Sequence, residues 1–191
     1  LSPTAEGQLS QLASLEQWGT IQWESMNRSF AWAQNMEYNA TDAPNLTNVE
    51  DIAAMFFAAG KVDADLSGWN TSTITDMSFM FDGATAFNGN ISSWDVSNVT
   101  NMLEMFQNAT SNNQDLSSWD VTGVENFRSM FQNAAAFNAD ISQWKTSSAT
   151  TMLGMFAGAS SFNRDVSQWD VSSVTDMRNM FANASNFDRN L

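Results

Sequence analysis

The chain has 191 residues, of which 43% are hydrophobic, and this is enough for one compact domain with a real core. It contains no cysteine and no histidine, which excludes disulfide staples, thiol nucleophiles and the commonest zinc ligands. A formal net charge of −14 argues against binding to nucleic acid or to an anionic membrane surface, and it suits cationic partners or calcium.

The N-terminal part departs from the rest of the sequence. We expect residues 1–8 to be a lead-in and residues 9–191 to form a single solenoid domain, in which residues 9–48 are degenerate N-terminal capping coils. No apolar run reaches the ~20 residues of a membrane span, so no membrane insertion is expected in this segment. The first residue is Leu1 and no signal-peptide pattern follows it, which predicts an excised or processed piece of a longer protein.

A 25-residue period begins at Val49 and continues to residue 191 without an insertion. It is marked by the tryptophans Trp69, Trp94, Trp119, Trp144 and Trp169. Met-Phe pairs follow the same period from Met55-Phe56 to Met180-Phe181. We count seven coils, and because Leu191 falls just before the next tryptophan position, the C-terminus is expected to be truncated within an array or to lack a cap.

One unit shows how a coil is expected to fold. The alternation of Trp94, Asp95 and Val96 predicts a short strand with Trp and Val on one face and Asp on the other. The apolar positions that follow, from Val99 to Ala109, are three and four residues apart and predict one face of a helix. The fold class is therefore predicted as α/β, a right-handed leucine-rich-repeat-like solenoid of about seven strand-helix coils with a short parallel sheet on one face.

The spacing I-x-x-W-x-V resembles the strand segment of leucine-rich repeats, and the unit FNxDISxWDVSxVTxMxxMFxxA is similar to the BspA-like, or mycoplasma-type, surface-protein repeats. The resemblance covers nearly the whole chain. It implies a secreted or cell-surface domain associated with adhesion, with no catalytic residues. The unit around Trp144 departs from the pattern, since it reads W-K-T-S-S-A in place of W-D-V-S-x-V.

The tryptophans have two interpretations. Stacked aromatic rings could bind carbohydrate if they were exposed, but Trp94 shares its face with Val96, which favours a buried ladder of indoles. Each buried indole N–H then needs an acceptor inside the protein.

The outward positions beside the tryptophans are the predicted ligand-binding surface. In leucine-rich repeats the equivalent surface is the usual ligand face, and stacked carboxylates repel one another until a cation or a basic partner binds. The predicted ligand-binding residues are Asn70, Ser93, Asp95, Ser118, Asp120, Gln143, Lys145, Gln168 and Asp170.

The return loops carry Asn and Asp at positions i and i+2. Such oxygen pairs are typical of calcium loops, but Asx residues also make the turns that coil corners need, and no Glu is present to close a calcium loop. The candidate calcium ligands are Asp63, Asp65, Asn88, Asn90, Asn113, Asp115, Asn138, Asp140, Asn163 and Asp165.

No unlike pair of carboxylates or other catalytic constellation stands out, so an enzyme is not expected. The sequence predicts a non-enzymatic extracellular recognition or adhesion module, with a protein or cell-surface partner along the acidic face. Two alternatives remain open: a carbohydrate-binding or calcium-dependent lectin-like domain, and a structural spacer of a larger surface protein.

Overall fold

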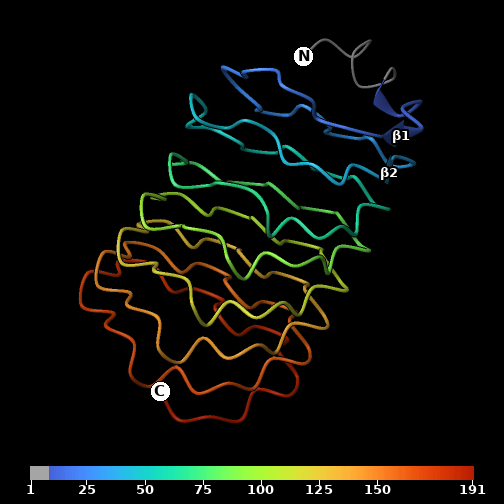
Figure 1. Ribbon diagram of the computed structural model, residues 1–191. Helices are drawn as coiled ribbons and strands as arrows, with labels where there is room; N and C mark the ends of the chain where they lie inside the picture. Colours follow the sequence, from blue (N-terminus) through green and yellow to red (C-terminus); the bar gives the residue numbers. More distant parts are fainter. Residues whose placement is uncertain (1–8) are drawn as a thin grey trace.

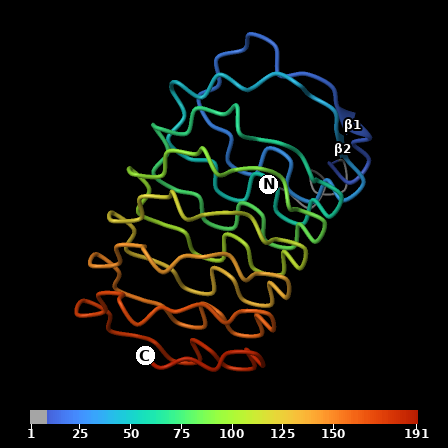
Figure 2. The same cartoon turned by 60° about the horizontal axis from the view of Figure 1, so that its bottom comes forward.

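The computed structural model describes residues 9–191 and shows a stack of coils, each lying on the one before it (Figure 1). The N-terminal and C-terminal coils lie at opposite ends of the stack (Figures 1 and 2). The two regular strands are β1 (Ser14–Leu15) and β2 (Glu37–Tyr38), which pair in parallel in the first two coils. The remainder of residues 9–191 is built from turns and extended segments with almost no helix.

The prediction of α/β strand-helix coils is wrong. Residues 102–109, which carry the helical spacing, form a run of overlapping turns. The amide of Met105 donates to the carbonyl of Met102 at 3.3 Å, and the amide of Ala109 donates to that of Phe106 at 3.1 Å. Bonds of this kind reach back three residues, whereas an α-helix needs bonds that reach back four.

The amides between those turn bonds point out of the coil and hold the stack together. Glu104 donates to the carbonyl of Arg128 at 2.9 Å, and Phe106 donates to that of Met130 at 2.9 Å. The same alternation of turn bonds and inter-coil bonds recurs along the stack, from the first coil onward. The turn runs lie at residues 26–33, 52–59, 77–84, 102–109, 127–134, 152–159 and 177–184, and their seven copies agree with the predicted number of coils.

Each turn run requires a left-handed backbone at two places, which a helix cannot contain. In the run at 102–109 these are Glu104 and Asn108, with φ of 55° and 58°. A type II turn needs a positive φ at its third residue, where glycine and asparagine are best tolerated. The second place is occupied in the other regular coils by Ala58, Gly83, Asn133, Gly158 and Asn183. The sequence therefore carried a signal against a helix at these positions.

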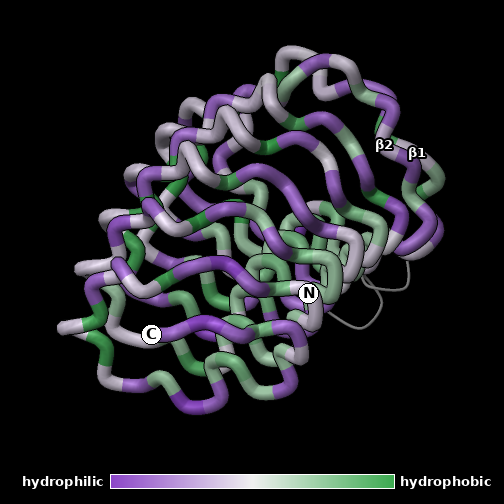
Figure 3. Tube along the Cα trace, turned by 90° about the horizontal axis from the view of Figure 1, so that it is seen from below, coloured by the Kyte–Doolittle hydropathy of each residue, from purple (hydrophilic) through white to green (hydrophobic). Residues whose placement is uncertain are grey.

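The predicted strand around each tryptophan is also not regular strand in the structure, so the short parallel sheet on that face is wrong as well. The alternation itself is correct: Trp94 and Val96 are buried, and Asp95 between them is exposed. Hydrophobic and hydrophilic stretches recur at matching places in successive coils (Figure 3). Isolated parallel bridges link the starts of the turn runs instead, for example between Asp76 and Asn101.

Phenylalanine rings form the centre of the core. Phe81 and Phe106 stack with their ring centroids 5.6 Å apart and their planes 3° apart, and Phe106 stacks on Phe131 in the same way. Rings at this separation add dispersion energy to the burial of a large apolar surface. The column of stacked phenylalanines consists of Phe30, Phe56, Phe81, Phe106, Phe131, Phe156 and Phe181.

A second column is formed by the repeat tryptophans, which are buried as the alternation predicts. The indole N–H of Trp94 donates to the carbonyl of Leu66 in the preceding coil at 2.9 Å, and Trp144 donates in the same way to Leu116. The second coil lacks a tryptophan and has the buried Pro44 in that position of the repeat. Trp18 and Trp69 are in edge contact across this coil, with centroids 5.5 Å apart.

Candidate functional site

The predicted ligand-binding residues lie together on one exposed face. We call the column Asn70, Asp95, Asp120, Lys145 and Asp170 the acidic row; all five are exposed, one from each of five successive coils. Ser93, Ser118, Gln143 and Gln168 are exposed beside it. The structure thus brings the nine predicted residues onto a single surface.

The aspartates of the acidic row also shape the backbone. Oδ1 of Asp120 accepts hydrogen bonds from the amide and the hydroxyl of Thr122, at 3.1 Å and 2.5 Å. Oδ1 of Asp95 accepts the same two bonds from Ser97. Hydrogen bonds from the residue two positions on lower the pKa of both carboxyls, so each is ionised at neutral pH. Oδ2 accepts no hydrogen bond in either case and both residues are exposed, which leaves half of each carboxylate available to a partner.

The serines and glutamines beside the acidic row make hydrogen bonds mostly within the protein. Ser93 and Ser118 donate their hydroxyls to the carbonyls of Ser67 and Ser92 in the preceding coil, at 2.8 Å and 2.7 Å. Gln143 donates its amide to the hydroxyl of Ser142. A partner would therefore meet carboxylates more readily than hydroxyls on this face.

The side chains of the candidate calcium ligands make two kinds of hydrogen bond within the protein. The first member of each pair forms a ladder between coils: Oδ1 of Asn88 accepts the amide of Asn113 at 2.9 Å, and Oδ1 of Asn113 accepts that of Asn138 at 2.8 Å. The second member makes a local turn, as Asp115 does by accepting the amide of Ser117 at 2.9 Å. In residues 9–191 no group of three or more His, Cys, Asp or Glu side chains is placed to hold a metal ion. Calcium binding by these loops stays a prediction.

A chain of hydrogen-bonded polar side chains on the turn runs, which is buried at Asp82 and exposed at Asn133, was not predicted from the sequence. Asn108 donates its side-chain amide to Asp82 at 3.1 Å, and Asn133 donates to Asn108 at 3.0 Å. Burial raises the pKa of Asp82 to about 6, and the nearby charge of Glu104 adds to this, while the bond from Asn108 opposes it. The recurrence of Asn or Gly at this position was visible, but its meaning depends on recognising the turn runs.

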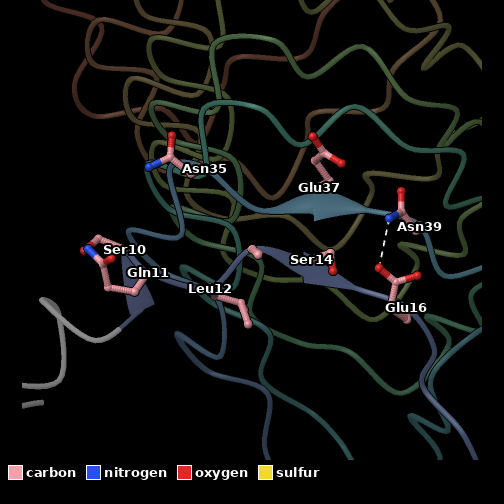
Figure 4. A pocket seen from close by; sticks show the side chains of 9 residues that line it. Ser10, Gln11, Leu12, Ser14, Glu16, Asn35, Glu37 and Asn39 are labelled. Carbon is pink, nitrogen blue, oxygen red and sulfur yellow. Dashed lines mark hydrogen bonds between the residues drawn. The ribbon is translucent and has the colours of Figure 1, made fainter.

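Two shallow depressions lie over the first three coils. One, of about 410 Å³, is lined by residues of β1 and β2, and Figure 4 shows Glu16, Glu37 and Asn39 on its walls. The side-chain amide of Asn39 donates to Glu16 at 3.0 Å (Figure 4), and hydrogen bonds from Ser14 and Asn39 lower the pKa of that carboxyl.

The second depression, of about 480 Å³, lies where the second coil lacks its tryptophan. Its lining includes Tyr38, Asp42, Asp65 and Trp69. The carboxylate of Asp42 accepts the amides of Trp18 and Gly19, which lowers its pKa, so this side chain also has a structural role.

The repeat pattern matches one family model, described as "Mycoplasma protein of unknown function, DUF285", over residues 24–135 and 112–191. The chain belongs to this family. The two matched ranges overlap and together span all of the regular coils, which agrees with the mycoplasma-type repeat that the sequence resembles. No curated protein and no solved structure matches the chain. Within residues 9–191 no helix is long and apolar enough to cross a membrane.

Proposed function

We propose that this member of the DUF285 family is a non-enzymatic extracellular recognition or adhesion module whose acidic row binds a basic protein or cell-surface partner. The observation that carries the proposal is the row itself. Its three carboxylates lie at exposed positions, and each holds a turn through one oxygen and has no hydrogen bond on the other. Asp95 and Asp120 lie in adjacent coils, and Asp170 lies two coils beyond Asp120. An extended partner with regularly spaced cations could engage several of them at once.

The electrostatic repulsion between carboxylates placed in one column supports the same proposal. The charge of Asp120 raises the pKa of Asp95, against the larger effect of the hydrogen bonds from Ser97. Repulsion between such neighbours is relieved when a cation binds between them. Lys145 supplies one such cation inside the row, and a basic partner would supply more. The resemblance to BspA-like surface repeats supports the extracellular placement.

The test compares charge removal on the acidic row with equal charge removal elsewhere. The triple variant Asp95→Asn, Asp120→Asn, Asp170→Asn keeps an oxygen for each turn while removing three charges. The matched control is Glu24→Gln, Glu50→Gln, Glu125→Gln, at exposed positions outside the row. We expect immobilised poly-lysine and arginine-rich peptides to bind the original chain and the control, and to bind the row variant much more weakly. Equal loss in both variants would show that net charge alone is responsible and would overturn the proposal.

The depression over the second coil favours a second candidate, a carbohydrate-binding domain. Its lining combines aromatic rings, Tyr38 and Trp69, with the carboxylates Asp42 and Asp65, and such combinations suit sugar rings and their hydroxyls. A glycan array read with and without a calcium chelator tests it. Binding that disappears on Asp42→Asn or on chelation would favour the lectin-like function. A structural spacer is the expected function if neither probe set binds.

A further inference from the structure

The depression of about 480 Å³ beside Trp69 has coils on both sides of it. Its lining comes from within residues 38–43 and 64–69, which belong to the second and third coils. The first and fourth coils lie on either side of these two in the stack (Figure 1). The depression is therefore a feature of the side of the stack and not of either end.

Pro44 leaves a backbone carbonyl in this depression without one of its usual donors. In the third coil, the carbonyl of Leu66 accepts the amide of Trp69 at 3.1 Å and the indole N–H of Trp94 at 2.9 Å. Thr41 holds the position of Leu66 in the second coil, and Pro44, three residues further on, has no N–H to donate. The carbonyl of Thr41 accepts no hydrogen bond from any residue within 9–191.

The indole of Trp69 does not supply the second donor. In the next four coils each repeat tryptophan donates to the carbonyl 28 residues earlier, which for Trp69 would be the carbonyl of Thr41. The indole of Trp69 instead hydrogen-bonds the hydroxyl of Tyr38, which also accepts the indole N–H of Trp18 at 2.7 Å. Thr41 is exposed and lines the depression, so an acceptor without a donor is available to a ligand there.

Two carboxylates line the depression together with this carbonyl. Asp42 accepts the backbone amides of Trp18 and Gly19, which lower the pKa of its carboxyl. Asp65 accepts hydrogen bonds from the hydroxyl and the amide of Ser67, which lower its pKa in the same way. Both carboxylates are therefore ionised at neutral pH, and no Lys or Arg lines the depression.

Small residues keep the depression open. Ala40, Ala43 and Ala64 line it, and a Cβ on Gly68 would meet nothing within 4 Å. The four coils that follow carry Ser or Gln at the position of Gly68. An aliphatic stem can lie along such small apolar side chains while its polar end reaches the acceptors.

We propose that this depression binds one primary ammonium group, carried by a lysine side chain of the basic partner. An ammonium group brings three donors and no acceptor, which matches the free carbonyl of Thr41 and the two carboxylates. A neutral sugar would also bring acceptors, and the side-chain amide of Asn39, which could serve them, is already bonded to Glu16 at 3.0 Å. The lining therefore favours a lysine over a neutral sugar.

The inference rests on the proposed function, because the lysine belongs to the partner that the acidic row binds. Trp69, at the edge of the depression, directly precedes Asn70, the first residue of the row. Asp95 lies one coil beyond Asn70, at a spacing of about 5 Å per coil. A partner with two cationic side chains a few residues apart would thus place one in the depression and the other beside Asp95.

Two variants test the depression by calorimetric titration with hexalysine. Asp65→Asn removes one charge, and its matched control is Asp115→Asn, because Asp115 accepts the amide of Ser117 as Asp65 accepts that of Ser67 but lies outside the depression. We expect Asp65→Asn to bind hexalysine about tenfold more weakly than the control does. Gly68→Gln, which introduces the residue that two later coils carry at this position, leaves the charge unchanged and should weaken binding similarly. Equal affinity of Asp65→Asn and Asp115→Asn, or unchanged affinity of Gly68→Gln, would overturn the inference.

Chemical-shift perturbation separates this inference from the proposed function. The probe is N-acetyl-lysine amide, and its Nε-acetylated form is the control ligand, with the same stem and no charge. We expect only the charged form to shift the signals of the Gly68 amide and the Trp69 indole N–H, both in the original chain and in the triple asparagine variant of the acidic row.

The outcomes of this experiment are distinct. Shifts that persist in the row variant support the inference even if that variant and its glutamine control bind poly-lysine equally, which would overturn the proposed function alone. Equal shifts with the two lysine forms, or no shift at these signals, would overturn the inference alone. Larger shifts with N-acetylglucosamine than with the lysine amide would also overturn it, in favour of the lectin-like function.

Discussion

The indole nitrogen of Trp144 lies 2.9 Å from the carbonyl oxygen of Leu116, which belongs to the coil before it. Both residues are buried, and the indole is a second donor to a carbonyl that also accepts the amide of Trp119 at 3.2 Å. Each repeat tryptophan from Trp94 onward makes this bond to a residue 28 positions earlier. The tryptophan thus joins two coils through a polar contact as well as through packing.

Replacing Trp144 separates these two contributions. Trp144→Phe keeps most of the apolar burial and removes one of the two hydrogen bonds that the carbonyl of Leu116 accepts, the other coming from the amide of Trp119, so we expect a loss of about 0.5–1.5 kcal/mol in the free energy of unfolding. Trp144→Ala also opens a cavity and should cost about 3–5 kcal/mol. Urea denaturation followed by circular dichroism measures both values. Equal costs for the two variants would contradict a separate role for the indole N–H.

Asn112 interrupts an aromatic column that otherwise contains Phe87, Phe137, Phe162 and Phe187. It is fully buried and its side-chain nitrogen has no hydrogen-bond partner. Asn112→Phe would fill the column and remove the unpartnered amide nitrogen, and it would lose only the long 3.4 Å bond that Oδ1 accepts from the amide of Gln114, so we expect it to raise the free energy of unfolding by about 1–3 kcal/mol. The reciprocal change, Phe137→Asn, should destabilise by at least as much. A destabilised Asn112→Phe variant would show that the site has closed around the smaller side chain.

Two glycines provide a matched pair for testing the spacing between coils. A Cβ on Gly89 would lie 1.7 Å from the carbonyl oxygen of Ala64 in the preceding coil, whereas a Cβ on Gly68 would meet nothing within 4 Å. We therefore expect Gly89→Ala to lower the melting temperature strongly, because backbone atoms must move apart. Gly68→Ala should leave the melting temperature unchanged or raise it slightly by restricting the unfolded chain. Thermal unfolding of the two variants makes the comparison.

Asp82 should make stability fall as pH rises through the weakly acidic range. Its pKa is raised from 3.8 to about 6 in the folded protein, chiefly by burial. Between these two values the folded state binds more protons than the unfolded state, so the free energy of unfolding decreases with increasing pH and levels off above pH ~6. Asp82→Asn removes this contribution and can still accept the bond from Asn108. We expect the variant to gain most over the original chain at pH 7 and little near pH 4, as measured by urea denaturation at each pH. A gain that does not change with pH would contradict the assignment.

The aspartates of the acidic row should tolerate asparagine better than alanine. Asp120→Ala removes the acceptor for the amide and hydroxyl of Thr122, so it should cost about 0.5–1.5 kcal/mol in the free energy of unfolding. Asp120→Asn retains a side-chain oxygen and loses one of a series of like charges, so its melting temperature should be nearly unchanged. The same order is expected at Asp95 and Asp170. Identical melting temperatures for the alanine and asparagine variants would show that the turn bond contributes nothing.

The sequence alone was sufficient to predict the period, the number of coils and the inward direction of Trp94 and Val96, because a buried column requires apolar residues at constant spacing. It was misleading about the backbone between Val99 and Ala109. Apolar residues three and four apart point to one side in a helix, and they also do so in a run of turns that each close over three residues. What distinguishes the two is the left-handed residue that each turn needs, and Gly83 and Gly158 were the visible sign of it.

The candidate site was predictable as a surface but not in its chemistry. Exposure of Asp120 follows from the burial of its neighbours, which the repeat pattern already contained. One oxygen of its carboxylate accepts hydrogen bonds from Thr122, and the other accepts none. This arrangement depends on the turn, which the repeat pattern could not show. Similarly, the Asn pairs of the return loops were recognised as oxygen donors, while their use in holding successive coils together became evident only from the position of Asn88 beside Asn113.

The inter-coil amide bonds join residues 24 to 26 positions apart, as from Glu104 to Arg128, so they link each coil to its immediate neighbours. A duplication or deletion of one whole 25-residue unit therefore leaves every remaining coil with neighbours of the same kind on both sides. Unequal recombination between repeats can thus change the reach of such a molecule in steps of one coil without a new folding problem. The same event would lengthen or shorten the acidic row by one residue, so that molecular length and the number of contacts offered to a partner would vary together.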